Sequence, residues 1–401
     1  MNEPKLRFKA GDGSQFPDWE EKVFGDFVDT HLEKTSDKDK YPLYSLTIES
    51  GVQPKTDRYE REFLVKKEGD NYKIVPPNAF VYNPMNLRFG ALKVNHEKFS
   101  VSVSGYYDVF SLKDDSVLAF WENYLVTPKM LNYYFSIATG SLIEKLRVHY
   151  SQFVKIKKPL PSLPEQQKIA EFLLTIDTVI EKQKETVSAW EERKKGVMQK
   201  LFSQEVRFKA DDGSDFPEWE KKKINDVAYL NPKTGTIPNE FYYMDLGGVD
   251  RGSWRDKKVV LKEEAPSRAQ RIAMLGDCFF QSVRPLNMGH YLLKNKLDKP
   301  VVASTGFIQM RMKKDICPDF IFQLLFDENF NKGVELRCTG QTYPAINVDG
   351  FSDIAVCVPC LAEQQKIADC LSSLDEVIEK QKATLAAWEE LKKGLLQQMF
   401  V

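Results

Sequence analysis

A segment of 39 residues that occurs twice constrains the fold of this chain more than any other feature. Residues 164–202 return as residues 362–400, with 24 identities in 39 aligned positions and a shift of 198 (362 minus 164). In each copy apolar side chains recur every seven residues, and a second series follows four residues after the first. This pattern is typical of a coiled-coil seam, so the sequence predicts two long, related helices.

The predicted helices need a partner for their apolar stripes. A helix of 38 residues (165–202) would be roughly 57 Å long, and an apolar stripe of that length is not stable facing water. The chain between the copies is long enough to close on itself, which predicts an antiparallel pair. The positions predicted to pack in the seam are Ile169, Leu173, Ile176, Ile180, Gln183 and Trp190 in the first helix, and Ile367, Leu371, Leu374, Ile378, Gln381 and Trp388 in the second.

Polar residues of the repeat carry two further predictions. Gln183 and Gln381 fall near the middles of their helices, where an amide pair would fix the register of an antiparallel crossing. The alternative is that each glutamine is a partly exposed residue at the edge of the seam. Ser162 and Glu165 have the spacing of a capping box at the start of the first helix. Cys360 replaces the serine in the second copy, so we expect a weaker cap there.

A second, shorter repeat precedes each domain. Residues 7–20 and 207–220 agree at 11 of 14 positions and are rich in Gly, Pro, Asp and Ser, which is typical of an ordered linker. The order linker, domain, helix therefore occurs twice, as an internal pseudo-twofold repeat. The predicted fold class is α+β, with two mixed α/β domains separated by two long antiparallel coiled-coil helices. The predicted boundaries are linker 1–20, domain 21–160, helix 161–203, linker 204–220, domain 221–358 and helix 359–401.

The two domains between the helices differ in sequence but share a weak pattern. In the first domain, β-branched and aromatic runs between turn residues predict short strands. The expected elements are strands at Tyr72–Val75, Ala79–Tyr82, Phe99–Val103 and Tyr106–Leu112 and a helix at Pro128–Ala138, and the domain is expected to close on Phe153–Lys157. Residues 79–90 align with 278–289, and residues 102–112 with 303–312, with recurring glycines and apolar positions. Two domains that recognise two different sequences would need a shared scaffold with different polar residues.

Composition and charge limit the possible functions. Lys and Arg number 57 and Asp and Glu number 58, so the chain is nearly neutral. No apolar run approaches the roughly 20 residues that span a bilayer, and the first residues lack the apolar core of a signal peptide, so we expect a cytoplasmic protein. The pair Cys357 and Cys360 has redox or zinc spacing, but Pro159 and Ser162 replace it in the first copy. We therefore expect all six cysteines to be reduced, structural thiols.

The sequence contains no recognisable catalytic constellation and no predicted metal set. It lacks a Gly-rich nucleotide loop, a GxSxG elbow and an HExxH motif, and its four histidines are not spaced as ligands. Asn83-Pro84-Met85-Asn86 resembles an amino-methyltransferase motif but lacks the second proline and the aromatic residue, so we interpret it as a turn.

Matched loops in both domains carry residues suited to nucleic-acid recognition. Arg reads guanine, Asn and Gln read adenine, and Lys, Arg, Ser and Thr contact phosphates. Taken singly, each such residue could equally be a solvated turn residue. The candidate DNA-binding residues are Tyr82, Asn83, Asn86, Arg88, Arg147 and His149 in the first domain, and Gln281, Ser282, Arg284, Asn287, Gln341, Thr342 and Tyr343 in the second.

Together these features resemble the specificity subunit of type I restriction-modification enzymes. The resemblance covers nearly the whole chain and is sharpest at the helix entries, residues 159–173 and 358–371, at ASTGF (303–307) and at TGQTYPAI (339–346). It implies two target-recognition domains, each reading one half of a split site in double-stranded DNA. It also implies partners: two methyltransferase subunits docked on the helices, which carry S-adenosylmethionine and methylate adenine, and restriction subunits that use ATP and Mg²⁺. The chain itself would be non-catalytic and would bind no cofactor.

Two other classes of function remain open from the sequence. A coiled-coil scaffold would use its domains to bind proteins and would show no affinity for DNA. An enzyme with an unrecognised site would methylate or cleave DNA as the purified chain alone. Because phosphate contacts supply much of the affinity of DNA-binding proteins, the near-neutral charge indicates that partners would supply part of the contact with DNA.

Overall fold

The chain folds into two compact units. The computed structural model describes residues 4–48, 51–55, 72–113, 117–142, 145–233 and 235–400. The first unit comprises residues 1–184 and 383–401, and the second comprises residues 185–382. Each unit therefore contains one of the two domains together with one part of each long helix.

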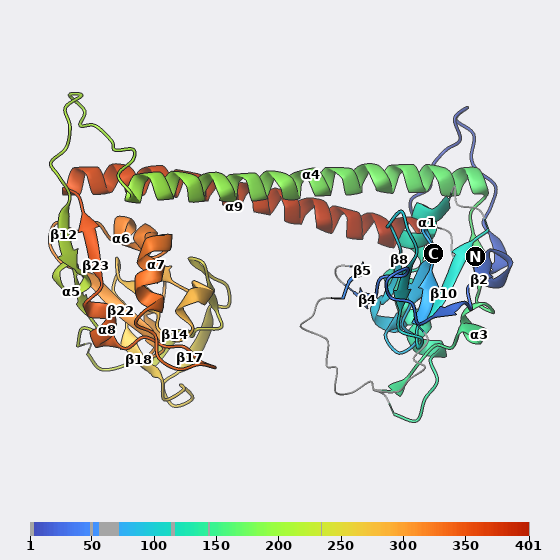
Figure 1. Ribbon diagram of the computed structural model, residues 1–401, viewed down its shortest axis with the longest axis horizontal. Coiled ribbons are helices and arrows are strands. Elements are labelled where there is room, and N and C mark those ends of the chain that lie inside the picture. Colours follow the sequence, from blue (N-terminus) through green and yellow to red (C-terminus); the bar gives the residue numbers. More distant parts are fainter. Residues whose placement is uncertain are drawn as a thin grey trace. The chain divides into compact units, whose positions relative to one another are not determined.

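The two long helices, α4 (Leu163–Phe202) and α9 (Leu361–Met399), pack antiparallel, as predicted. In the first unit, where Figure 1 shows α4 and α9 side by side, Asp177 of α4 pairs with Lys392 of α9, with 2.6 Å between Oδ1 and Nζ. In the second unit Lys194 and Asp375 make the same contact at 2.6 Å. The two pairs are related by the 198-residue shift (177 to 375, 194 to 392). Lys194 and Lys392 occupy seam positions, four residues after Trp190 and Trp388, and each has an anionic partner on the other helix.

Most of the predicted seam residues are buried. Those that the structure buries are Ile169, Leu173, Ile176, Ile180, Ile367, Leu371 and Ile378. Those that it leaves half-buried are Gln183, Trp190, Leu374, Gln381 and Trp388. The pairing of the two central glutamine amides stays a prediction.

The last residues of α9 complete the core of the first unit. Met399 and Phe400 are each 1% exposed. The Phe400 ring lies 5.7 Å from that of Phe120 and 5.4 Å from that of Tyr124, between ring centroids. The amide of Leu6 also donates to the carbonyl of Gln398 at 3.0 Å. Residues from both ends of the sequence are therefore needed to build this one unit.

The first domain is built on a four-stranded sheet in the order β2-β10-β7-β8, with smaller sheets β1-β11, β3-β6-β9 and β4-β5. Its strands are β1 (Glu20–Val23), β2 (Val28–Thr30), β3 (Lys34–Thr35), β4 (Tyr44–Thr47), β5 (Gly51–Pro54), β6 (Tyr72–Val75), β7 (Phe80–Tyr82), β8 (Leu92–Val94), β9 (Val101–Val103), β10 (Asp108–Leu112) and β11 (Lys157–Leu160). Its helices are α1 (Leu118–Tyr124), α2 (Pro128–Ile137) and α3 (Tyr150–Phe153).

The four predicted strands and the helix are present, and the segment Phe153–Lys157 that closes the domain joins a helix to a strand. Helix α3 ends at Phe153, and strand β11 begins only at Lys157. Phe153 and Ile156 are both buried. Residues three apart share one face of a helical turn but lie on opposite faces of a strand, so the burial of both Phe153 and Ile156 fits the turn.

The second domain repeats the central sheet of the first, as β13-β22-β19-β20, and also contains the sheets β17-β14-β21-β18, β12-β23 and β15-β16. Its strands are β12 (Glu220–Lys223), β13 (Ala228–Leu230), β14 (Glu240–Met244), β15 (Val249–Asp250), β16 (Ser253–Trp254), β17 (Lys258–Leu261), β18 (Ala269–Ile272), β19 (Cys278–Gln281), β20 (Tyr291–Leu292), β21 (Val301–Ser304), β22 (Phe307–Met312) and β23 (Ala355–Val358). Its helices are α5 (Ile224–Val227), α6 (Pro318–Leu324), α7 (Glu328–Glu335) and α8 (Val348–Ser352). The weak sequence pattern therefore does reflect a shared scaffold.

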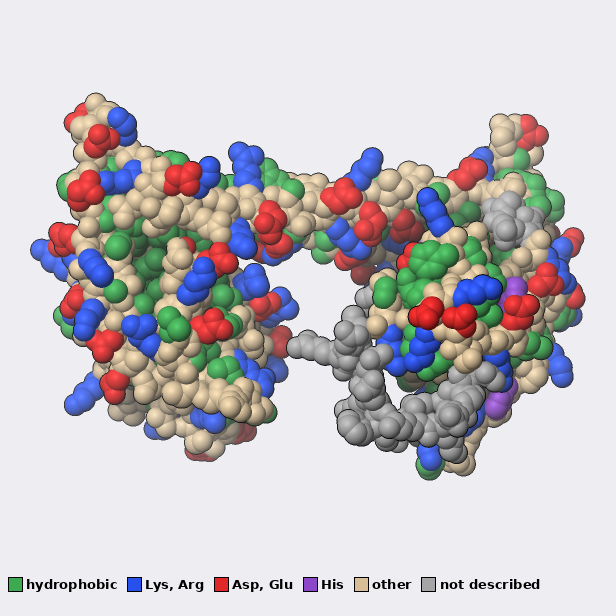
Figure 2. Space-filling view, viewed as in Figure 1, with side chains coloured by type: hydrophobic (Ala, Val, Ile, Leu, Met, Phe, Trp, Pro, Cys, Tyr) green, Lys and Arg blue, Asp and Glu red, His purple; other side chains and the backbone are tan. Residues whose placement is uncertain are grey.

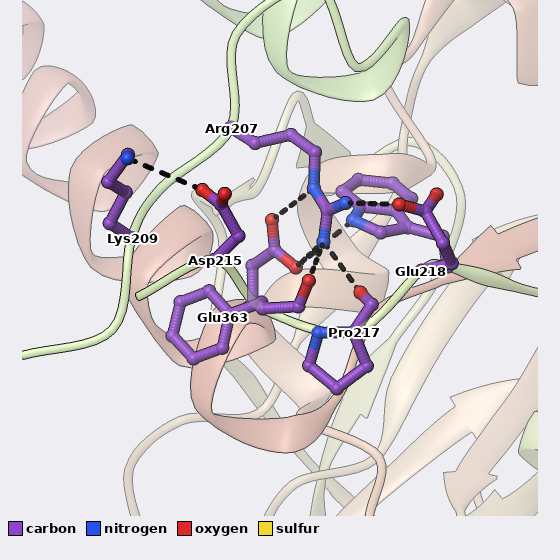
Figure 3. A network of polar contacts seen from close by, with 8 residues as sticks. Arg207, Lys209, Asp215, Pro217, Glu218 and Glu363 are labelled. Atoms are coloured by element: carbon purple, nitrogen blue, oxygen red, sulfur yellow. Dashed lines mark hydrogen bonds and ion pairs between the residues drawn. The ribbon is translucent and has the colours of Figure 1, made fainter. Parts of the chain in front are cut away.

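The repeated linkers fasten to the first turn of the long helices. Figure 3 shows Arg207 donating through Nε and Nη2 to the Glu363 carboxylate, at 3.1 and 2.9 Å. The same guanidinium donates to the carbonyl of Pro217 at 2.6 Å. In the first unit Arg7 makes the equivalent contacts with Glu165, at 3.0 and 2.8 Å. We refer to each Arg–Glu pair as the linker clamp.

The linker clamp replaces the predicted capping box. The Glu165 side chain is fully buried and accepts from Arg7. The Ser162 hydroxyl is also buried and makes no hydrogen bond within the described part of the chain. A charge-assisted bidentate pair is stronger than a bond to one backbone amide, so the arginine from the linker takes the carboxylate. The capping-box prediction was therefore wrong.

Candidate nucleic-acid interface

Two loops of the second domain are joined by backbone hydrogen bonds. The first, the turn loop, follows strand β19 and covers residues 281–289. The second, the Thr-Gly loop, covers residues 339–345. The amide of Arg284 donates to the Pro344 carbonyl at 2.7 Å, and the amide of Ile346 donates to the Ser282 carbonyl at 3.0 Å. The two loops therefore form one continuous surface.

Arg284 and Tyr343 lie together on this surface. The Arg284 guanidinium carbon is 4.2 Å from the centre of the Tyr343 ring, and the ring is 64% exposed. Arg284 has a left-handed backbone, with φ of 50° and ψ of 57°. A non-glycine residue in this region is strained, and such strain is concentrated at functional sites. A hollow of about 390 Å³ lies beside the pair, lined by residues that include Leu286 and Asn287.

The side chain of Gln281 stabilises the conformation of the turn loop through two hydrogen bonds. Its Oε1 accepts from the amide of Gly289 at 2.8 Å, and its Nε2 donates to the carbonyl of Val283 at 2.8 Å. Its own amide donates to Nδ1 of His290 at 3.1 Å, and burial lowers the pKa of His290 to about 3. The Gln281 side chain is buried with both ends of its amide bonded. The structure thus corrects the interpretation of Gln281 as a base-reading residue.

The first domain has the same two loops, although their sequences differ. Its turn loop covers residues 83–91 and its Thr-Gly loop begins at Thr139. The amide of Val148 donates to the Pro84 carbonyl at 2.9 Å, and Thr139 and Arg147 exchange backbone hydrogen bonds of 2.9 and 3.0 Å. The sequence comparison missed this Thr-Gly loop. Thr139-Gly140 lies 200 positions before Thr339-Gly340 (339 minus 139) and is the signal that could have identified it.

Two candidates in the first domain are buried, and a third has the turn geometry that the sequence predicted. Tyr82 is fully buried, with its ring 5.4 Å from that of Phe153, so its proposed contact with DNA is wrong. Arg88 is 9% exposed, and its guanidinium lies over the rings of Phe89 and Phe135. The side-chain Oδ1 of Asn83 accepts from the amide of Met85 at 3.0 Å, which is the geometry of a turn.

The other candidates lie at or near the surface of the loops. The exposed ones are Asn86, His149, Arg284, Asn287, Gln341, Thr342 and Tyr343. Arg147 and Ser282 are half-buried, and the Ser282 hydroxyl donates to the Gly306 carbonyl at 2.8 Å. The structure therefore gathers the exposed candidates of each domain on its two joined loops.

The surfaces of both units carry charges of both signs. On the face shown in Figure 2, Lys and Arg side chains are interspersed with Asp and Glu over both units.

Within the described ranges, no group of three or more His, Cys, Asp and Glu residues could hold a metal ion. None of the described helices is long and apolar enough to cross a membrane.

The fold and the duplicated loops define a class of two-domain recognition proteins built on paired long helices. The family model described as "Type I restriction modification DNA specificity domain" matches residues 17–188 and 217–387. This chain belongs to that family.

Relatives and solved structures agree with this assignment. The MjaVIII specificity subunit of Methanocaldococcus jannaschii is 27% identical over 260 residues, which are 61% of this chain and 61% of that protein. The HindI specificity subunit of Haemophilus influenzae is 25% identical over 189 residues, 46% of this chain and 41% of that protein. The chain thus matches less than two thirds of the length of these relatives. The S subunit from M. genitalium has the same fold, with a TM-score of 0.55, 14% identity and coverage of 100% of this chain and 99% of that one.

Proposed function

We propose that this chain is the specificity subunit of a type I restriction-modification complex, with each domain reading one half of a bipartite target in double-stranded DNA. The observation that carries the proposal is the duplicated pair of joined loops. Each domain builds its loops on its own four-stranded sheet, and the two sheets have equivalent strand orders. The exposed side chains of the loops nevertheless differ between the domains. A conserved scaffold with different exposed residues suits two unlike half-sites.

The partners follow from the family. Two methyltransferase subunits would dock on the helices α4 and α9 and would hold S-adenosylmethionine, and restriction subunits would use ATP and Mg²⁺. The chain itself would bind no cofactor and perform no catalytic step. Because its ligand would be genomic DNA, we expect it to act in the cytoplasm.

Charge supports a complex rather than a chain that binds DNA alone. The sequence has 57 Lys and Arg against 58 Asp and Glu. A protein that depends on its own phosphate contacts needs a basic surface. Methyltransferase subunits would therefore supply much of the non-specific contact, while the loops of this chain select the sequence.

Co-expression with a methyltransferase subunit tests the proposal. Long-read sequencing of the host DNA would map methylated adenines. We expect a two-part motif with a fixed gap, absent from cells that lack this chain. A stable complex with no new methylation and no affinity for DNA would refute the proposal and favour a protein-binding scaffold. Methylation or cleavage by the purified chain alone would refute its non-catalytic role.

A further inference from the structure

The turn loops of the two domains contain two equivalent positions that face solvent in both, Asn86 with Arg284 and Phe89 with Asn287, and only the first is polar in both domains. Each loop contains a single 3₁₀ turn, Leu87–Phe89 in the first domain and Pro285–Asn287 in the second. The residue that caps the turn is Asn86 in the first and Arg284 in the second. The two are related by the 198-residue shift (86 to 284), and both are exposed.

The polar residue three positions earlier is also equivalent, but it turns inward in both domains. Asn83 accepts from the amide of Met85, and Gln281 joins Gly289 to Val283. Both side chains hydrogen-bond within the loops, and that of Gln281 is buried with both ends of its amide bonded. At the cap, in contrast, no hydrogen bond or ion pair with a described residue engages the side-chain amide of Asn86 or the guanidinium of Arg284. Of the equivalent positions that face solvent in both loops, the cap is therefore the one whose side chain can hydrogen-bond to a ligand in both domains.

Arg284 is presented in a fixed orientation. The Tyr343 ring supports one face of its guanidinium, the left-handed backbone sets its direction, and its amide is bonded to Pro344. A guanidinium held on an aromatic ring keeps its donor edge free, and that edge matches the O6 and N7 acceptors of guanine. Less conformational entropy is lost on binding when the side chain is already ordered.

Asn86 carries the corresponding chemistry for another base. A side-chain amide offers one donor and one acceptor, which match N7 and the N6 amino group of adenine in the major groove. The Asn86 backbone has φ of −108° and ψ of 5°, so it is not left-handed like Arg284. The two cap residues thus share a place in the fold but differ in recognition chemistry.

We propose that the cap of the 3₁₀ turn is a base-reading position in each domain, where Arg284 reads a guanine and Asn86 reads an adenine. Tyr343 is a positioning residue for Arg284. This inference rests on the proposed function, because it assumes that the loops meet the major groove of DNA. It adds the bases read at one position of each half-site.

The test maps methylation by the complete complex that carries one substitution at a time. Arg284→Lys keeps the charge but removes the planar bidentate edge. We expect the motif to lose its requirement for one guanine in one half-site only, and methylation of the original site to fall between about fivefold and 150-fold. Asn86→Ala is expected to relax one adenine in the other half-site. Arg268→Lys, at an exposed arginine before strand β18, is the matched control and should leave the motif unchanged.

The outcomes separate this inference from the proposed function. A wild-type complex without a bipartite motif would overturn both. A bipartite motif that Arg284→Lys weakens equally at all sites would overturn only the base-reading role, and would assign Arg284 to a phosphate. Tyr343→Leu gives a second variant at an exposed ring, and it should weaken selection of the same guanine. Tyr343→Phe keeps the ring and should preserve the motif, and loss of the motif there would refute the positioning role.

Discussion

Removal of the arginine of each linker clamp should destabilise the two units by different amounts. Glu363 is fully buried and accepts from Arg207 and also from Nε1 of Trp219, at 3.1 Å. Glu165 is equally buried and accepts from Arg7. The equivalent indole N–H of Trp19 is buried and makes no hydrogen bond within the described residues. Arg7→Ala therefore leaves a carboxylate without its charged partner, whereas Arg207→Ala leaves one that keeps a donor.

The magnitudes follow from burial and from the number of donors. Breaking a buried ion pair costs about 3–5 kcal/mol, and one hydrogen bond to a charged group contributes about 1.5–3 kcal/mol. We expect about 4 kcal/mol for Arg7→Ala, and about 2 kcal/mol less for Arg207→Ala. Each carboxylate lies in the first turn of a helix, where the dipole favours it equally in both units.

Native-state hydrogen exchange measured by mass spectrometry would report these losses separately. Peptides covering residues 163–170 and 361–368 sample the first turns of α4 and α9. Each variant should accelerate exchange only in its own unit, and Arg7→Ala should have the larger effect. The double variant Arg7→Met with Glu165→Met removes both charges and should be close to the wild type. An equal or larger loss for Arg207→Ala would refute the role assigned to the tryptophan.

Two further predictions concern stability. Asp375→Ala should lower the free energy of unfolding by about 1–3 kcal/mol more than Asp177→Ala, because Asp375 also accepts from the buried Gln323 at 2.8 Å. Urea unfolding of the two variants measures this difference. Equal losses of stability would contradict the prediction. The hydrogen bond that His96 Nε2 donates to the Glu122 carboxylate raises the pKa of His96 above its usual value, so this pair should stabilise the first unit at low pH and lose its effect as pH rises through the raised pKa. NMR titration should give a His96 pKa that falls in Glu122→Gln, and the associated change in stability should stay below about 1 kcal/mol because the pair is exposed.

The sequence contained enough information for the architecture because repeats and periodicity are properties of the chain alone. The seven-residue pattern predicted the antiparallel helices α4 and α9, and the 198-residue shift relates their matched ion pairs. The local capping prediction at Ser162 failed for a different reason. The carboxylate of Glu165, the other residue of the predicted capping box, has a partner 158 positions away in Arg7. Local spacing in the sequence cannot reveal so distant a partner.

The candidate interface was predicted at the level of loops but not of side chains. Tyr82, Asn83 and Asn86 lie within five residues of each other, yet the first is in the core, the second forms a turn and the third faces solvent. Alternation along a strand would distinguish these places, but strand β7 ends at Tyr82 and the chain then enters a 3₁₀ turn. Beyond Tyr82 the side chains no longer alternate between two faces of a strand. Residue type alone therefore does not predict in which direction each side chain points.

The closure of the first unit by the end of α9 has a consequence for synthesis on the ribosome. The second unit is one uninterrupted stretch, residues 185–382, and can complete its core as soon as that stretch has emerged. The first domain emerges earlier but must wait for Met399 and Phe400 to fill its core. The domain that is made first is thus finished last, and premature termination in the final turns of α9 would damage the amino-terminal domain rather than its nearer neighbour in the sequence.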